Sequence, residues 1–169
     1  MSLLATQSEQ AASTARIEQG VAALFSDIAD LFGNPRSFGA IFGLLFVSRE
    51  GMSMEEVAKR LAISAGSASQ GLRQLEEFGA ITHARDPETR VNLYRAKTEM
   101  RPLIQGFLNQ RVVPRMDSAS RQLEELRLVA SQLPESDAKH AQARLERLQN
   151  WLSRAKSLYP IAKKLFGKS

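Results

Sequence analysis

The 169-residue sequence contains no cysteine, one tryptophan, two tyrosines and two histidines. The lack of cysteine excludes disulfide bonds, thiol nucleophiles and zinc sites built from cysteine. The two histidines, His83 and His140, lie far apart in the chain, and neither has a second ligand at the short spacing typical of a helical metal site. We therefore expect no metal ion and no cofactor.

Catalytic motifs are lacking as well. Residues 66–69, Gly-Ser-Ala-Ser, have neither the preceding strand nor the Gly-Lys-Ser/Thr sequence of a phosphate-binding loop. The paired acids, such as Glu55-Glu56 and Glu76-Glu77, are adjacent, so their side chains point in different directions on a helix. The sequence therefore predicts a protein that is not an enzyme.

Long hydrophobic runs are also missing. The longest, residues 40–47, is far too short to span a bilayer, and the chain does not open with a secretory signal pattern. The content of hydrophobic residues (43%) and of charged residues (24%) is ordinary for a folded domain. We expect a cytoplasmic protein with no membrane partner.

Positive charge is concentrated in the second half of the chain. The net charge is +5, but residues 1–34 carry −3, residues 35–98 carry +2 and residues 99–169 carry +6. Such a basic balance suits a polyanionic partner, although charge alone does not identify one.

Residues 52–79 have the pattern of two short helices joined by a tight turn. Ser53 and Glu56 form a capping box that begins the first helix. Residues 62–64 form the turn, and Ser64 caps a second helix that runs to about Phe78. Gly79 ends that helix as a C′ glycine. This order predicts a helix-turn-helix.

The following residues have the pattern of a β-hairpin. Residues 81–85 and 90–96 are extended in character, and residues 86–89, Asp-Pro-Glu-Thr, favour a type I turn. A hairpin placed directly after a helix-turn-helix forms a wing. The sequence thus predicts a mainly α fold, a winged helix-turn-helix with a small β-hairpin wing and long N- and C-terminal helices.

The second helix of this motif has one polar face. Ala68, Leu72 and Leu75 share the side that faces the core. The opposite side carries Gly66, Ser67, Gln70, Arg73, Gln74 and Glu77. Gln pairs with adenine and Arg with guanine in the major groove, while the N–H groups exposed at a helix start attract phosphate. On an arbitrary helix, such residues are more often a polar face exposed to solvent. Here the surrounding helix-turn-helix favours a face that contacts DNA.

Residues in three segments are therefore candidates for DNA contact. On the second helix and at its cap they are Ser64, Gly66, Ser67, Gln70, Arg73 and Gln74. Arg85 and Arg90 flank the turn of the wing, where they reach phosphates or else pair with Asp86 and Glu88. Arg36, at the start of an earlier helix, is a further candidate for the DNA backbone.

Helical patterns flank the motif on both sides. A stripe of Ile17, Val21, Leu24, Ile28 and Leu31 predicts a first helix that Gly33 ends, with Asn34 as the cap and Pro35 as the first residue of the next helix. In that helix Gly39 and Gly43 lie one turn apart, which permits another element to approach closely.

Beyond the wing, Thr98 is predicted to cap a long helical region that Pro114 interrupts. A second repeat of apolar residues at spacings of three and four follows the break at Pro134 and reaches Phe166, with a kink or an end expected near Leu158 because of Pro160.

These patterns give three segments: a dimerisation helix (1–34), a winged helix-turn-helix (35–98) and a helical dimerisation region (99–169). The flanking helices carry three long apolar stripes, which is more apolar surface than one small winged-helix domain can bury. This favours dimerisation.

The assembled motifs resemble the MarR-like winged-helix transcriptional regulators, and among them the GbsR-type branch. The matching stretches are Asn34-Pro35-Arg36 with Gly39, Ile41 to Phe46, Ile63-Ser64, Gly66 to Ser69, Leu72 to Glu76, and Gly79. The resemblance covers roughly residues 15–98. It implies a homodimeric transcription factor, commonly a repressor, in which Ser67, Ser69, Gln70 and Arg73 lie where the recognition helix meets DNA.

The resulting prediction is a homodimer that binds double-stranded DNA at a near-palindromic operator, with two recognition helices about 34 Å apart. The sequence does not decide whether a small-molecule effector binds. A quaternary ammonium effector has little support, because a cage for that group needs aromatic residues and this chain has few, Trp151 and Tyr94 among them. The alternative is a winged-helix module that contacts a protein in a larger assembly.

Overall fold

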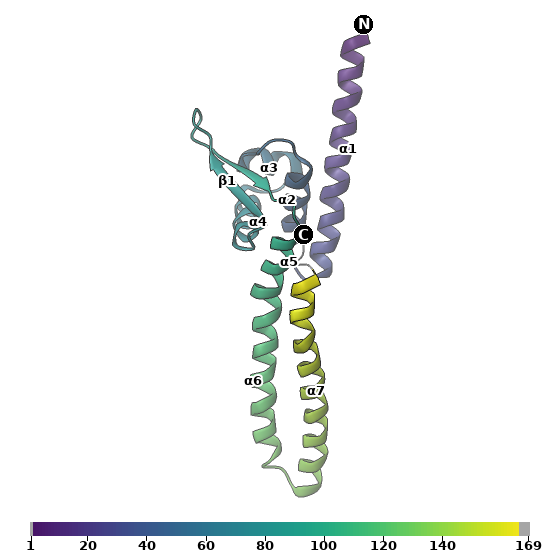
Figure 1. Ribbon diagram of the computed structural model, residues 1–169, viewed down its shortest axis with the longest axis vertical. Coiled ribbons are helices and arrows are strands. Elements are labelled where there is room, and N and C mark those ends of the chain that lie inside the picture. The colour runs from purple at the N-terminus through teal and green to yellow at the C-terminus, as the bar shows by residue number, and fades with distance from the viewer. Residues whose placement is uncertain (1, 166–169) are drawn as a thin grey trace. The chain divides into compact units, whose positions relative to one another are not determined.

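The computed structural model describes the backbone of residues 2–165 and the side chains of residues 9–161 and 164. The chain divides into two compact units, Met1–Leu103 and Ile104–Ser169 (Figure 1). The first unit holds helices α1 (Ser2–Leu31), α2 (Arg36–Val47), α3 (Met54–Leu61) and α4 (Ala65–Glu77), and strands β1 (Ile81–Arg85) and β2 (Asn92–Ala96). Helix α5 (Arg101–Phe107) leads from the first unit into the second.

Within the first unit, the elements from α2 to β2 form the winged helix-turn-helix fold that the sequence predicts. Strands β1 and β2 pair antiparallel, with Ile81 opposite Ala96 and Arg85 opposite Asn92. The wing is joined to the loop before α3 by an isolated bridge between Met52 and Tyr94 and by a hydrogen bond from Arg95 to the carbonyl of Arg49 (3.1 Å). The fully buried core consists of large side chains from α2, α3 and α4: Phe42, Ile41, Leu44, Leu72, Leu75 and Val57.

Helices α1 and α2 pack closely because α2 lacks side chains at the crossing. A Cβ atom on Gly39 would lie 2.0 Å from the carbonyl oxygen of Phe25, and one on Gly43 would lie 2.7 Å from that of Val21. The close approach predicted from these two glycines is therefore confirmed.

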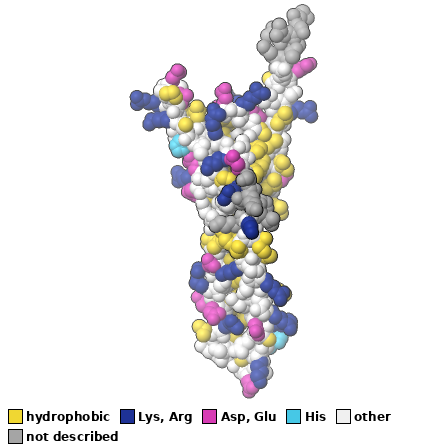
Figure 2. All heavy atoms as spheres, viewed as in Figure 1, with side chains coloured by type: hydrophobic (Ala, Val, Ile, Leu, Met, Phe, Trp, Pro, Cys, Tyr) yellow, Lys and Arg dark blue, Asp and Glu magenta, His cyan; other side chains and the backbone are white. Residues whose placement is uncertain are grey.

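The side of α1 that meets α2 is not the large apolar stripe. It is a row of small buried residues, Ala22, Ser26 and Ala29, together with the half-buried Phe25, whose ring packs edge-on against Phe42 of α2 at 5.0 Å. The stripe residues Leu24 and Leu31 are 56% and 80% exposed. Figure 2 shows hydrophobic side chains along this exposed side of α1.

The corner between α1 and α2 differs from the prediction in one detail. Gly33 ends α1 with a φ of +69°, as expected. Asn34, however, does not cap α2: Pro35 occupies that position, without a side-chain cap hydrogen bond. Asn34 is buried instead, its N–H donates to the carbonyl of Ala29 (2.8 Å), and its side-chain oxygen accepts from Gln74 (3.4 Å).

The second unit is a helical hairpin. It contains the π-helical turn η1 (Leu108–Val112), α6 (Val113–Ala130) and α7 (Glu135–Leu165). The interruption expected at Pro114 is confirmed as η1, since proline has no N–H to continue the α-helical bonding and stands at the start of α6. Lys156 on α7 pairs with Asp117 on α6 at 2.8 Å and lowers the pKa of that carboxyl.

One predicted helix cap in this region is wrong, and of the kink or end predicted near Leu158 the end does not occur. Thr98 does not cap a helix, because α5 begins at Arg101, where Pro102 falls in the first turn that tolerates proline. Helix α7 does not end near Leu158 but continues through Pro160 to Leu165, and the Tyr159 hydroxyl donates to Asn109 (2.5 Å) to hold this end against η1. Phe166 lies outside the described residues.

Among the described residues, none of the helices combines the length and the apolar character that a membrane span requires.

Candidate nucleic-acid interface

The turn between α3 and α4 is built by two serine caps and one left-handed residue. The Ser53 hydroxyl accepts a hydrogen bond from the N–H of Glu56 (3.1 Å), and the Ser64 hydroxyl accepts one from the N–H of Ser67 (3.1 Å). Ala62 adopts a φ of +51° between them. Both predicted caps are confirmed, although the Glu56 carboxylate pairs with Arg60 (3.0 Å) rather than closing the capping box.

Helix α4 is held against α2 at its inner face. Gly71 allows the contact, since a Cβ atom there would lie 2.4 Å from the terminal methyl group of Ile41. Ala68, Leu72 and Leu75 are buried on the same side. This packing fixes which face of α4 points away from the core.

The outer face of α4 exposes Gly66, Gln70 and Arg73, with Ser64 exposed at the cap. No ion pair joins Arg73 to a carboxylate among the described residues. Ser67, Ser69 and Gln74 are half-buried along the edges of this face, and the Gln74 amide is held by Asn34. The structure thus brings together the residues predicted on α4, with the long polar side chains of Gln70, Arg73 and Glu77 exposed.

The wing presents two arginines that are not neutralised by their acidic neighbours. One carboxylate oxygen of Asp86 accepts hydrogen bonds from the N–H groups of Glu88 and Thr89 and from the Thr89 hydroxyl (2.7–3.0 Å). The backbone hydrogen bond from Thr89 is the main cause that lowers the pKa of Asp86. Arg85 donates to the carbonyl of Arg90 (3.0 Å), and neither arginine forms an ion pair with a described carboxylate.

Strand β2 begins at Asn92 and not at Arg90 as predicted. Arg90 has a φ of +58°, and its N–H donates to the carbonyl of Asp86 (2.9 Å), so it belongs to the turn. This places the exposed Arg90 side chain at the end of the wing, where Figure 2 shows basic side chains projecting.

Arg36 lies in a different setting from the other predicted residues. Its guanidinium is 2.6 Å from Asp27 and 3.5 Å from Asp30, both on α1. The hydrogen bond to Asp27 raises the pKa of Arg36. Two carboxylates therefore compete with any phosphate for this side chain.

One contact near the site was not anticipated from the sequence. The His83 ring on β1 hydrogen-bonds the Glu76 carboxylate on α4 and lies 5.6 Å from the Tyr94 ring. It ties the wing to α4. The seven-residue separation across the Gly79 turn gives no periodic signal that would have revealed it.

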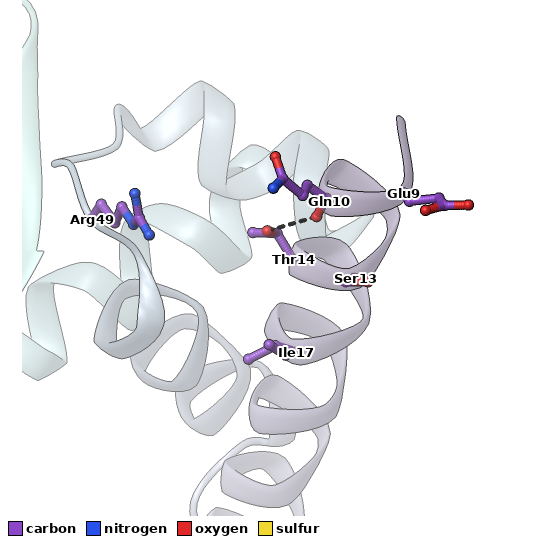
Figure 3. Close-up of a pocket in the computed structure, with 6 residues that line it drawn as sticks. All are labelled: Glu9, Gln10, Ser13, Thr14, Ile17 and Arg49. Atoms are coloured by element: carbon purple, nitrogen blue, oxygen red, sulfur yellow. Dashed lines mark hydrogen bonds between the residues drawn. The ribbon is translucent and has the colours of Figure 1, made fainter. Parts of the chain in front are cut away.

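The first unit also has open hollows on its surface. One of about 810 Å³ lies between α1 and Arg49 and is lined by Glu9, Gln10, Ser13, Thr14 and Ile17 (Figure 3). Another of about 470 Å³ lies between α3 and the wing, beside Met54 and Tyr94. Among the described residues no group of three or more His, Asp or Glu side chains is placed to hold a metal ion.

No protein-family model matches the chain, and no curated protein sequence matches it. Solved structures do resemble it. One titled a transcriptional regulator shares 21% identity over 85% of this chain and 97% of its own, with a TM-score of 0.50. The S. aureus MepR–DNA complex shares 20% identity over 81% and 91% (TM-score 0.38), and the transcriptional regulator SlyA 15% over 89% and 96% (TM-score 0.35). The first likeness supports the winged-helix fold.

Proposed function

We propose that this chain is a sequence-specific, DNA-binding transcriptional regulator of the MarR-like kind and of its GbsR-type branch. The observation that carries the proposal is the outer face of α4, where Gln70 and Arg73 are exposed and Arg73 forms no ion pair with a carboxylate among the described residues. These two side chains match the hydrogen-bonding edges of adenine and guanine in the major groove.

In this proposal the start of α4 contacts the DNA backbone. Ser64, Gly66 and Ser67 lie at the cap and first turn, where small side chains leave room for a phosphate and the positive end of the helix dipole favours it; the Ser67 N–H is already bonded to the Ser64 hydroxyl. Ser69 and Gln74 flank the groove-facing residues. Arg85 and Arg90 on the wing reach neighbouring phosphates, while Arg36 contributes only if it leaves its two aspartates.

The protein acts as a cytoplasmic homodimer on a near-palindromic operator and represses by occupying it. Two copies of α4 then enter successive major grooves, about 34 Å apart. The exposed apolar stripe of α1 supports this assembly, because a surface of that kind is typical of a subunit interface.

Selection of bound duplexes from a random pool tests the proposal. The selected sites should contain two related half-sites, and Arg73→Ala should cost about 1–3 kcal/mol at one base-pair position and relax specificity there. Equal loss on selected and random DNA would count against a base contact. Absence of salt-sensitive binding to any duplex would favour a protein-interaction module instead.

Arg90→Ala provides the matched control on the wing. Because Arg90 is proposed to contact a phosphate, its loss should weaken binding to all sequences alike and lower the slope of log affinity against log salt by roughly one. An unchanged slope would remove Arg90 from the interface.

A further inference from the structure

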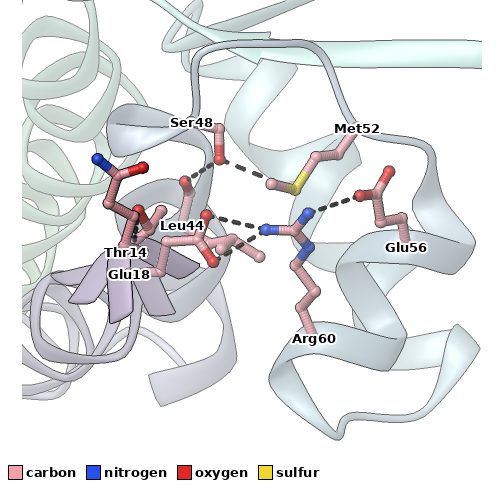
Figure 4. A network of polar contacts seen from close by, with 8 residues as sticks. Thr14, Glu18, Leu44, Ser48, Met52, Glu56 and Arg60 are labelled. Carbon is pink, nitrogen blue, oxygen red and sulfur yellow. Dashed lines mark hydrogen bonds and ion pairs between the residues drawn. The ribbon is translucent and has the colours of Figure 1, made fainter. Parts of the chain in front are cut away.

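An arginine on α3 bridges two helices that are distant in the sequence. Arg60 Nη1 lies 2.9 Å from both carboxylate oxygens of Glu18 on α1, and Arg60 Nη2 lies 3.0 Å from Glu56 on its own helix (Figure 4). The Glu18 side chain is only 16% exposed. The pair joins positions 42 residues apart, so it forms only when α3 is docked against α1.

Helix α3 packs mainly against α4 and also touches α2 and β2, and the Arg60–Glu18 pair adds a link from α3 to α1. It is eight residues long, and Val57 is its one fully buried side chain. It shares the tight turn at Ala62 with α4, so a tilt of α3 moves the start of α4 as well. The Arg60 side chain is 41% exposed while that of Glu18 is only 16% exposed, so solvent and salt screen this hydrogen-bonded ion pair in part.

The charge balance around Arg60 favours the bridge. Partial burial alone would lower the pKa of its guanidinium, but hydrogen bonds and charge from Glu18 and then Glu56 outweigh that effect and raise it. The hollow beside it, of about 360 Å³, is lined by residues of α1, the α2–α3 loop and α3, including Thr14, Ser48 and Met52.

We propose that Arg60 is a positioning residue that sets where the helix-turn-helix stands relative to α1, and thereby the distance between the two recognition helices of the dimer. The inference rests on the proposed function, because it assigns to α1 the dimer contact and to α4 the DNA contact. Arg60 itself touches no base; it acts through α3.

Glu18→Gln and Glu56→Gln form a matched pair that tests this role in the full chain. Each removes one carboxylate charge facing Arg60, but only the first removes the link between helices. Glu18→Gln should lower affinity for the selected operator about twofold to fivefold, the range expected for one such ion pair. It should also reduce the difference in affinity between the selected operator and an operator whose half-sites are moved by one base pair. Glu56→Gln should leave the spacing preference unchanged.

A charge exchange provides the rescue. Glu18→Arg with Arg60→Glu, made in the Glu56→Gln background so that the new carboxylate is not repelled, should restore the spacing preference. The inference is overturned if both single variants lose affinity equally, or if Glu18→Gln weakens random and selected DNA alike with its spacing preference intact.

A measurement without DNA keeps the two proposals separate. Because the chain has no cysteine, Gln19→Cys on α1 and Lys59→Cys on α3 allow a specific spin-label pair. The distance distribution should broaden in Glu18→Gln and stay narrow in Glu56→Gln. If the wild type selects no DNA sequence, the proposed function fails, but the spin-label distances still test whether Arg60 holds α3 against α1. An unbroadened distance distribution in Glu18→Gln refutes that role of Arg60.

Discussion

At the scale of single residues, the wing depends on one acid. Asp86 lies near two arginines, yet its carboxylate is occupied by three donors of its own turn. Those hydrogen bonds shape the turn that carries Arg90 in its left-handed conformation. The same acid that could have neutralised the wing thus leaves its positive charge available.

This arrangement predicts a pH dependence for Asp86. Its pKa in the folded chain lies below the ordinary 3.8, so its stabilising effect is complete above that value and is lost as the pH falls through the lowered pKa. Asp86→Ala should lower the Tm at pH 7, and the difference from the wild type should shrink below pH 3.8.

Glu88→Ala is the matched control, because it removes a neighbouring exposed carboxylate for which no side-chain hydrogen bond is described. It should leave the Tm nearly unchanged at both pH values. An NMR titration of the Asp86 carboxyl with a midpoint at or above 3.8 would contradict the prediction.

At the scale of helices, the α1–α2 crossing depends on the absence of a side chain. A Cβ on Gly39 would overlap the backbone of Phe25, so Gly39→Ala forces the two helices apart. Overpacking of this kind costs about 1–3 kcal/mol or more in the free energy of unfolding. Urea unfolding monitored by circular dichroism should detect it.

Gly20→Ala is the control on the other helix of the same pair. A Cβ there meets nothing within 4 Å, and alanine is the better helix former, so the variant should gain up to about 1 kcal/mol. Equal stability of the Gly39 and Gly20 variants would show that the close crossing does not contribute to folding.

Much of this architecture could be predicted, because local chemistry decides it. The caps at Ser53 and Ser64, the stop at Gly79 and the close approach at Gly39 each follow from the conformations that these residues favour. The inward face of α4 followed from periodicity, which also placed Arg73 outside.

Long-range pairing could not be predicted in the same way. Periodicity identified the apolar stripe of α1 but did not show that α2 packs beside it, on a row of small residues and Phe25. Likewise, the ion pairs of Arg36 with Asp27 and of Arg60 with Glu18 depend on how helices dock. The sequence therefore located the candidate interface but not the contacts that hold it in place.

At the scale of the whole molecule, both units expose large apolar side chains. In the first unit they follow α1 and include Ile17, Leu24, Ile28 and Leu31. In the second unit they include Leu126, Leu128, Val129, Leu133, Leu148, Trp151, Leu158 and Ile161. Surfaces of this extent are uncommon on a monomer, which favours burial against a second copy.

The α1 stripe offers the sharper test of dimerisation. The wild type should sediment with about twice the 18.7 kDa mass of one chain, whereas Leu24→Glu with Leu31→Glu should place charges in the interface and release folded monomers. Gln19→Glu, an exposed change on the same helix, should leave the dimer intact. A wild type that sediments as a stable folded monomer at micromolar concentration would contradict the dimer, and with it the paired recognition helices that a near-palindromic operator requires.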